Sequence, residues 1–194
     1  MDPHGLTSSH PPRSLGNREG GFTLIELLVV LLIIGILLAI AIPTFLSVTK
    51  TANNTAAQSN LETALTASDA YYTNNDQSFS GIDIVGGKVS DISQIDSGLQ
   101  FVSARSGKPS TAVGQISFYV SSSNDAVMLA SYSRGTRTCW YIVEIKGKQP
   151  AGSPLGGKTA AGTYYGVAPQ LAASACVANG ARLTSSQLGS FPSG

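Results

Sequence analysis

The sequence has 194 residues, 12% of them charged, and its 12 lysines and arginines nearly balance its 11 aspartates and glutamates. Because these charges almost cancel, no whole-molecule field would draw the chain to nucleic acid or to acidic lipid. The two histidines, His4 and His10, both lie near the N-terminus. A chain that loses its first segment therefore has no histidine, which excludes Ser-His-Asp and Cys-His catalysis and most zinc sites.

The first 42 residues divide into a polar segment and an apolar one. Residues 1–21 are rich in proline and glycine and show no helical period, so we expect them to be unfolded. Residues 22–42 are almost wholly apolar. At about 1.5 Å per residue they predict a helix of roughly 30 Å, the thickness of the hydrocarbon layer of a membrane.

Residues 43–74 change character and predict an amphipathic continuation of the same helix. Apolar residues recur there at spacings of three and four, with polar residues between them, which is typical of a helix with one buried face. This apolar stripe consists of Ala57, Leu61, Ala64, Leu65 and Tyr72. The turn-prone sequence Asn74-Asn75-Asp76 is expected to end the helix.

Residues 75–194 predict a globular head built on a small antiparallel sheet. Residues 77–109 are mixed and glycine-rich, and are expected to be a long connection with at most a short strand or a turn of helix. Alternating or β-branched runs then predict an antiparallel meander of three strands, followed by a fourth, short strand. These runs are residues 115–121, 126–132, 138–145 and 163–167. The fold class expected is therefore α+β, with a long N-terminal helix packed on the sheet.

A carboxylate inside the apolar run is the most informative feature of the sequence. Glu26 lies near the start of this run, although an ionised group in a membrane is costly and is by default a functional residue with a partner. A cut between Gly21 and Phe22 would create that partner, the α-amino group of Phe22. Glu26 could then pair with the amine of its own chain or with that of a neighbouring chain.

These residues resemble the class III signal of type IV pilins and type II secretion pseudopilins. The resemblance covers Gly21, Phe22, Thr23, Leu24, Ile25, Glu26, the apolar run and Pro43. It implies that prepilin peptidase removes residues 1–21 and N-methylates Phe22, and that Glu26 pairs with the Phe22 amine of the adjacent subunit in a filament. Thr23 is assigned to the same assembly site.

Two residues of the apolar run are expected to loosen its helix. Pro43 has no N–H for the carbonyl of Ala39 and crowds that turn, and Gly35 weakens the helix locally. We therefore predict that the backbone from Gly35 to Pro43 extends or melts during assembly.

The cysteines, Cys139 and Cys176, are too far apart for a CxxC redox motif. In an exported domain two such residues predict a disulfide, which would close a loop of nearly forty residues. The alternative is two unpaired, buried thiols. By the resemblance, the bridge frames the disulfide-bounded region of a pilin.

The resulting hypothesis is a structural pilus subunit that performs no chemistry and needs no cofactor. The subunit would wait in the cytoplasmic membrane with its head outside, and would then join a filament on the cell surface. By resemblance its partners are copies of itself, prepilin peptidase, an inner-membrane assembly platform, a cytoplasmic assembly ATPase and membrane lipid. No specific nucleic acid is indicated.

Alternatives remain open for the N-terminal region and for the type of filament. Ala39-Ile40-Ala41 mimics the cleavage site of a secretory signal peptide, and the run could also be a plain anchor for an unrelated binding module. The filament could instead be a secretion pseudopilus, or the subunit a minor pilin. Major pseudopilins as a family carry a calcium site in the C-terminal loop, whereas this chain has no acidic residue after Glu144, which favours a pilus.

Three further patterns are interpreted as coincidental. Residues 152–159 match the phosphate-binding pattern GxxxxGK[ST], but no helix is predicted after them. Asn53-Asn54-Thr55 is a glycosylation sequon on a predicted helix, where polar surface explains it, and Ser190 and Ser193 give no positive indication of glycosylation. The carboxylates Asp76, Asp83, Asp91 and Asp96 lack the spacing of metal ligands.

Overall fold

The computed structural model describes residues 21–82, 84–85, 88–89, 98–147, 160–180, 187–188 and 190–191. The chain divides into two compact units, Met1–Pro43 and Thr44–Gly194. One long helix, α1 (Leu24–Asn74), has residues in both units and is helical through Pro43. Its end at Asn74 agrees with the predicted turn.

In the first unit, α1 carries apolar side chains on all sides, and none of them is buried. The N-terminal part of α1 is long and apolar enough to cross a membrane. A helix that is apolar all round is stable only where water is excluded. This part of the chain therefore needs lipid or other protein around it.

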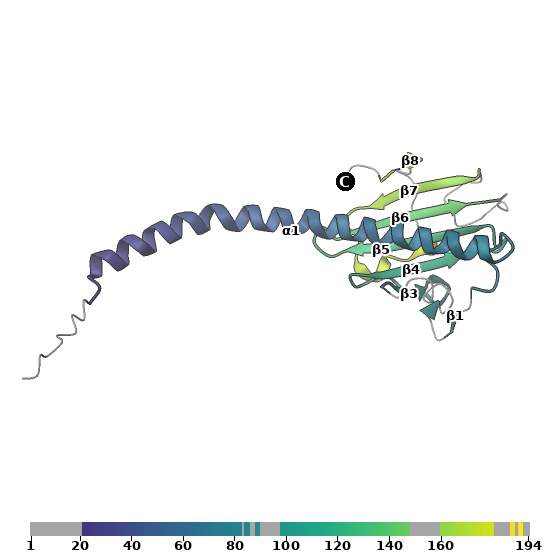
Figure 1. Cartoon of the computed structure of the whole chain (residues 1–194), viewed down its shortest axis with the longest axis horizontal. Coiled ribbons are helices and arrows are strands. Elements are labelled where there is room, and N and C mark those ends of the chain that lie inside the picture. Colours follow the sequence, from purple (N-terminus) through teal and green to yellow (C-terminus); the bar gives the residue numbers. More distant parts are fainter. Residues whose placement is uncertain are drawn as a thin grey trace, which may run out of the picture. The chain divides into compact units, whose positions relative to one another are not determined.

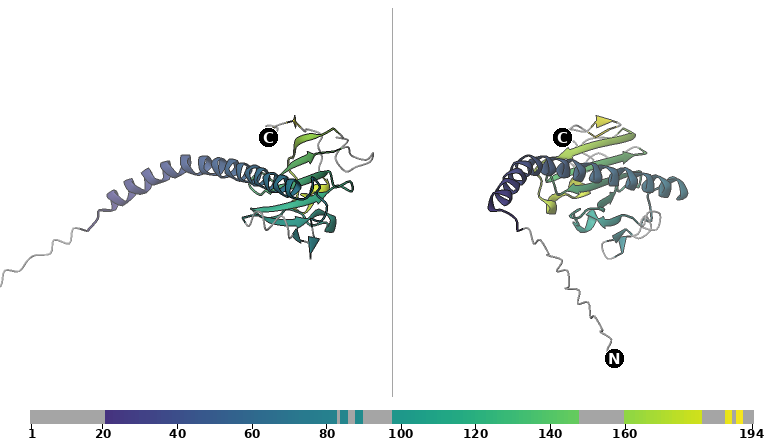
Figure 2. Two further views of the ribbon diagram at one scale, coloured as in Figure 1. Left: turned by 45° about the vertical axis from the view of Figure 1, so that its right-hand side comes forward. Right: turned by 60° about the vertical axis from the view of Figure 1, so that its left-hand side comes forward.

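In the second unit, α1 lies across one face of a β-sheet (Figures 1 and 2). Ala57, Leu61 and Ala64 are buried against the sheet, and Leu65 and Tyr72 are partly buried. The predicted apolar stripe is confirmed, because the residues at spacings of three and four are those that contact the sheet.

The described residues form one sheet of eight strands that lie side by side in chain order (Figure 1). The strands are β1 (Ile84–Val85), β2 (Lys88–Val89), β3 (Gln100–Ser103), β4 (Gln115–Val120), β5 (Ala126–Ser133), β6 (Thr138–Ile145), β7 (Gly162–Ala168) and β8 (Gln187–Leu188). All neighbouring strands are antiparallel except β3 and β4, which are parallel. Three short 3-10 helices complete the described fold: η1 (Ala104–Ser106), η2 (Ala173–Ala175) and η3 (Ala178–Gly180).

The fold class is confirmed, but the sheet is larger than predicted and mixed. The three predicted meander strands and the fourth strand correspond to β4, β5, β6 and β7. The segment 77–109, expected to be mainly a connection, contains β1, β2, β3 and η1. β3 adds a parallel pair, with Phe101 opposite Ile116. It has only four residues, too few for its alternation to stand out from a glycine-rich background.

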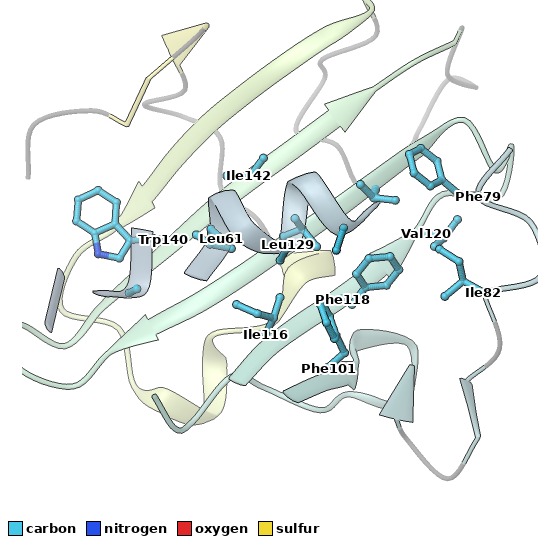
Figure 3. Close-up of a cluster of buried hydrophobic side chains, with 14 of the residues drawn as sticks. Leu61, Phe79, Ile82, Phe101, Ile116, Phe118, Val120, Leu129, Trp140 and Ile142 are labelled. Atoms are coloured by element: carbon cyan, nitrogen blue, oxygen red, sulfur yellow. The ribbon is translucent and has the colours of Figure 1, made fainter. Parts of the chain in front are cut away.

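The main core lies between α1 and the sheet. Leu61 is fully buried among Ile116, Leu129 and Ile142 from three neighbouring strands (Figure 3). At one side of this core, Phe101 meets Phe118 edge-on, with ring centroids 6.1 Å apart. Such aromatic contacts add to the free energy that burial of the rings already supplies.

The opposite face of the sheet is also buried, under the C-terminal segment. Met128 on β5 and Tyr141 on β6 pack with Cys176 and Ala178 in a second cluster. Two buried serines attach the covering loops: Ser117 accepts a hydrogen bond from the N–H of Ala178, and Ser110 accepts one from the N–H of Tyr132. Because both faces are covered, every residue of β5 and β6 is buried.

A polar cluster joins α1 to the sheet beside the main core. The Nζ atom of Lys146 lies 2.8 Å from Oε1 of Glu144 and 2.9 Å from Oδ1 of Asp69 on α1. Thr163 on β7 donates its hydroxyl hydrogen to the same buried Glu144. Burial lowers the pKa of Lys146, but hydrogen bonds to Glu144 and Asp69 and their charges outweigh it, so the pKa is raised. Lys146 therefore stays charged at neutral pH and compensates the buried carboxylate.

The turn between β5 and β6 sits directly on α1. A Cβ atom at Gly135 would lie 2.9 Å from Nδ2 of Asn53 and 3.2 Å from Cα of Lys50. Only glycine allows this approach without a shift of the neighbouring atoms. Thr136 donates a hydrogen bond of 2.6 Å to Oδ1 of Asn54, which fixes the turn in place.

This turn also bears on the sequon at Asn53. Nδ2 of Asn53 donates a hydrogen bond of 2.8 Å to the carbonyl of Thr49 and lies close to Gly135. A glycan on this nitrogen would have to displace both contacts. The interpretation of the sequon as ordinary polar helix surface thus agrees with the geometry.

Several sequence features lie outside the described residues. They are the segment 1–20 with His4 and His10, the phosphate-loop pattern at 152–159, Asp83, Asp91, Asp96 and Ser193.

Candidate functional site

The candidate site is the first turn of α1. Leu24 is the first helical residue, so Thr23 occupies the N-cap position and Glu26 is the third residue of the helix. The backbone N–H of Thr23 donates to Oε2 of Glu26 at 2.8 Å, and the hydroxyl of Thr23 donates to the same oxygen at 2.7 Å. In return, the hydroxyl oxygen of Thr23 accepts the N–H of Glu26 at 3.3 Å.

This reciprocal arrangement is a capping box. Two donors at the helix start, which would otherwise lack a partner within the helix, are satisfied by the side chains of Thr23 and Glu26. The negative charge also lies at the positive end of the helix dipole, where a carboxylate is stabilised. Thr23 thus has a definite structural task, which is to hold the carboxylate of Glu26 at the N-terminal end of the apolar helix.

Within this capping box only one carboxylate oxygen is used. The hydrogen bonds from Thr23 both end on Oε2. An ionised carboxylate has two oxygens and about four acceptor positions, so the group retains capacity for a further donor. Phe22 immediately precedes Thr23 and is 84% exposed, and Gly21 is exposed as well. The peptide bond between them is therefore accessible to another protein.

Sequence reasoning assigned Thr23 to the site but missed the reason. The pattern Thr-x-x-Glu at the start of an apolar run is the sequence signature of a capping box, and residues 23–26 contain it. The capping role of Glu26 and its pairing role are compatible, because the capping box leaves acceptor capacity on the carboxylate.

Gly35 and Pro43 lie inside a continuous helix. A Cβ atom at Gly35 would have no atom within 4 Å, so the glycine is not required by close packing in the isolated chain. Pro43 is accommodated without an interruption of α1. The expected loosening between these residues concerns the assembled filament and stays a prediction.

A second site of interest is the disulfide between Cys139 and Cys176, whose Cα atoms are 5.5 Å apart. Cys139 is on β6, and Cys176 follows η2 in the segment that covers the second face of the sheet. Both cysteines are fully buried. The bridge therefore attaches the covering segment to a central strand.

Within the described residues, no group of three histidine, cysteine, aspartate or glutamate side chains is placed to hold a metal ion. Asp76 is exposed beyond the end of α1.

Comparison with known proteins bears on the capping-box region. The family described as the prokaryotic N-terminal methylation motif matches residues 16–42, which contain Gly21, Phe22, Thr23 and Glu26. The type IV major pilin protein PilA of Myxococcus xanthus (strain DK1622) is 43% identical over 60 residues. The N-terminal segment is therefore similar to that of a type IV major pilin and carries the N-terminal methylation motif.

The extent of this similarity is limited. The PilA match covers 31% of this chain and 27% of the relative, so the chain matches little more than a quarter of that protein. No solved structure matches the chain significantly.

Proposed function

We propose that the chain is a structural subunit of a type IV pilus, with no enzymatic activity of its own. The observation that carries the proposal is the carboxylate of Glu26, held by Thr23 at the start of α1, whose apolar side chains are all exposed in the first unit. The methylation motif and the similarity to a type IV major pilin support it.

The hydrophobic effect on the apolar part of α1 explains both how the subunit is held in the membrane and how it assembles into a filament. The large side chains from Phe22 to Val48 are about half or more exposed, and burial of such area contributes about 25 cal/mol per Å². Lipid can cover this surface in a stored subunit, and neighbouring copies can cover it in a filament. The apolar area thus stays out of water before and after assembly.

Glu26 supplies the specificity that apolar contact lacks. An ionised carboxylate at the centre of a spanning helix costs about 2.5 to 3.5 kcal/mol on insertion scales. The capping box reduces this cost at Glu26, near the helix end, because both donors of Thr23 solvate one oxygen. Cleavage after Gly21 would create the Phe22 amine, and the free capacity of the carboxylate could accept that amine from an adjacent copy. A helix out of register would leave both charges buried and unpaired.

The domain organisation follows from this proposal. Residues 1–21 form a leader removed by prepilin peptidase, which also N-methylates Phe22. Residues 22–42 form the membrane and filament-core helix, residues 43–74 continue it, and residues 75–194 form the head closed by the disulfide. The subunit waits in the cytoplasmic membrane with its head outside, and an assembly platform and a cytoplasmic ATPase transfer it into a surface filament.

The test is to image surface filaments of the wild-type strain, a deletion strain and a complemented strain by electron microscopy. We expect filaments that contain this chain in the first and third strains and their loss in the second. Unchanged filaments in the deletion strain, with the chain confined to the membrane fraction of the wild type, would contradict the proposal.

A further inference from the structure

Within the described part of the head, two groups of charged side chains lie toward opposite ends of the second half of α1, and Glu62, Arg105 and Lys108 belong to neither group. At the end where α1 begins to contact the sheet, Lys50, Arg134 and Arg137 are all exposed, and we call them the basic pole. At the other end lie four carboxylates and one lysine, which we call the acidic pole. The acidic pole consists of Asp69, Asp76, Asp125, Glu144 and Lys146.

The position of the basic pole is set by the contacts of the β5–β6 turn. Gly135 brings the backbone of the turn against the backbone of Lys50, so Arg134 and Arg137 enter the chain at the same end of α1 as this lysine. Nε of Arg134 donates to the carbonyl of Thr111 at 2.9 Å. The carbonyl of Arg137 accepts the N–H of Leu171 at 2.8 Å. No acidic residue occurs in the turn or in α1 between Lys50 and Asn60.

The acidic pole is built in the same way at the far end. The N–H of Phe79 donates to the carbonyl of Asn124 at 2.9 Å, which brings the loop after α1 against the β4–β5 turn. The N–H of Lys146 donates to the carbonyl of Asp125 at 2.8 Å. Asp76 is exposed in that loop.

The charge balance of the acidic pole follows from its ion pairs. Lys146 is already engaged by Glu144 and Asp69, and Arg105 donates to the carbonyl of Val120 at the adjacent end of β4. The four carboxylates still outnumber these two cations, so the pole keeps an excess of negative charge.

The two poles are well separated. Lys50 and Asp69 are nineteen positions apart on one helix, which corresponds to about 28 Å at 1.5 Å per residue. This distance exceeds the screening length of about 8 Å at physiological ionic strength, so the poles of one head do not neutralise each other. Although the net charge of the chain is near zero, the described part of the head therefore carries opposite charges at two separate ends.

We propose that the basic pole of one subunit docks on the acidic pole of a second copy further along the filament. The inference rests on the proposed function, because it needs copies stacked with the same polarity. An open helical filament uses heterologous contacts, in which one patch meets a different patch on the next copy. Opposite charges on those two patches fix register and suppress wrong contacts.

Anionic lipid is the competing partner for the basic pole, since Lys50 follows the apolar run by eight residues. Lipid would engage one pole and leave the acidic pole without a partner. Docking between copies engages both poles, because the basic pole of one copy meets the acidic pole of the next. The charge pattern therefore favours a second copy over lipid as the partner.

The test is a charge exchange in the full-length chain, expressed in a deletion strain. Arg134→Glu with Arg137→Glu, and separately Asp76→Lys with Asp125→Lys, are each expected to lower the sheared filament yield about tenfold or more. The four changes together are expected to restore most of the yield. Lys108→Glu is the matched control, because Lys108 is an exposed cation outside both poles, and it should leave the yield unchanged.

The amount of processed subunit in the membrane is measured for every variant, so that loss of folding is separated from loss of docking. Wild-type yield from either pole variant would overturn the inference. So would failure of the four-residue exchange to restore filaments at a normal membrane level, the outcome expected if lipid or another molecule is the partner. Absence of filaments from the wild-type chain itself would instead contradict the proposed function.

Discussion

Replacement of Glu26 with alanine is expected to abolish filament assembly while leaving leader removal largely intact. The carboxylate is the proposed partner of the Phe22 amine of the adjacent subunit. Without it, that amine would be buried in the filament core with no counter-charge. Removal of one member of a buried ion pair costs about 3 to 5 kcal/mol, or about a hundredfold or more in an equilibrium constant. The measurement is an immunoblot of sheared filaments beside one of the membrane fraction.

Control variants separate the charge of Glu26 from its capping role. Glu26→Gln keeps an acceptor for the N–H of Thr23 but removes the charge, so it should fail almost as completely as Glu26→Ala. Thr23→Ala removes the hydroxyl from the capping box and should weaken assembly by a smaller factor, whereas Thr23→Ser should assemble. Glu62→Ala, on an exposed position of the same helix, is the matched control. Normal filaments from Glu26→Gln would rule out the charge pairing.

Loss of the disulfide is expected to lower the free energy of unfolding of the head by about 3 to 4 kcal/mol. Cys139 and Cys176 are 37 positions apart, and the chain-entropy model gives a value of this size for a loop of that length. The variant is Cys139→Ala with Cys176→Ala in the detergent-solubilised full chain. Trp140, the single tryptophan, is almost fully buried beside Cys139, so its fluorescence follows urea unfolding of the head.

The wild-type chain with reductant is the internal comparison for this variant. It should unfold at a similarly reduced urea concentration, because reduction also opens the loop. The mass of the peptides that contain the two cysteines should change with reductant in the wild type. A wild-type head with the same unfolding midpoint with and without reductant would contradict the stabilising role of the bridge.

The strands that sequence analysis located are those with a strong local pattern. Thr138–Ile145 combines β-branched and aromatic residues over a full strand, and it became β6 within the predicted limits. β3, with four residues, offers no such run, and its partner β4 lies beyond a loop that no local rule connects to it. Parallel pairing depends on the path of that loop, and therefore on tertiary packing rather than on propensity.

Sequence analysis also did not predict that both faces of the sheet are buried. A sheet with one solvated face alternates between polar and apolar residues, and sequence analysis interprets residues 126–132, which lie in β5, as alternating. In the structure every residue of β5 is buried, because η2 and η3 cover the second face. The near-continuous apolar run in the sequence of β5 was the indication that both faces of this strand are buried. The buried Glu144 could not be foreseen, since Lys146 reaches Asp69 of α1 while it pairs with Glu144 only after folding.

The candidate assembly site was predictable to a greater extent, because its residues are consecutive. Glu26 stands out from its apolar surroundings by composition alone, and the resemblance to the class III signal connects it with Gly21 and Phe22. The capping box was also visible as Thr-x-x-Glu. The charge poles, in contrast, depend on the contact between Gly135 and Lys50, residues that are far apart in the sequence.

The most direct test of the account is the mass of the N-terminal peptide of the mature chain, isolated from sheared filaments or from membranes. We expect a peptide that begins at Phe22 and carries one additional methyl group on its amine. A mature chain that begins at any other residue, such as the one after Ala41, would remove the positive partner of Glu26 and contradict the proposed assembly mechanism.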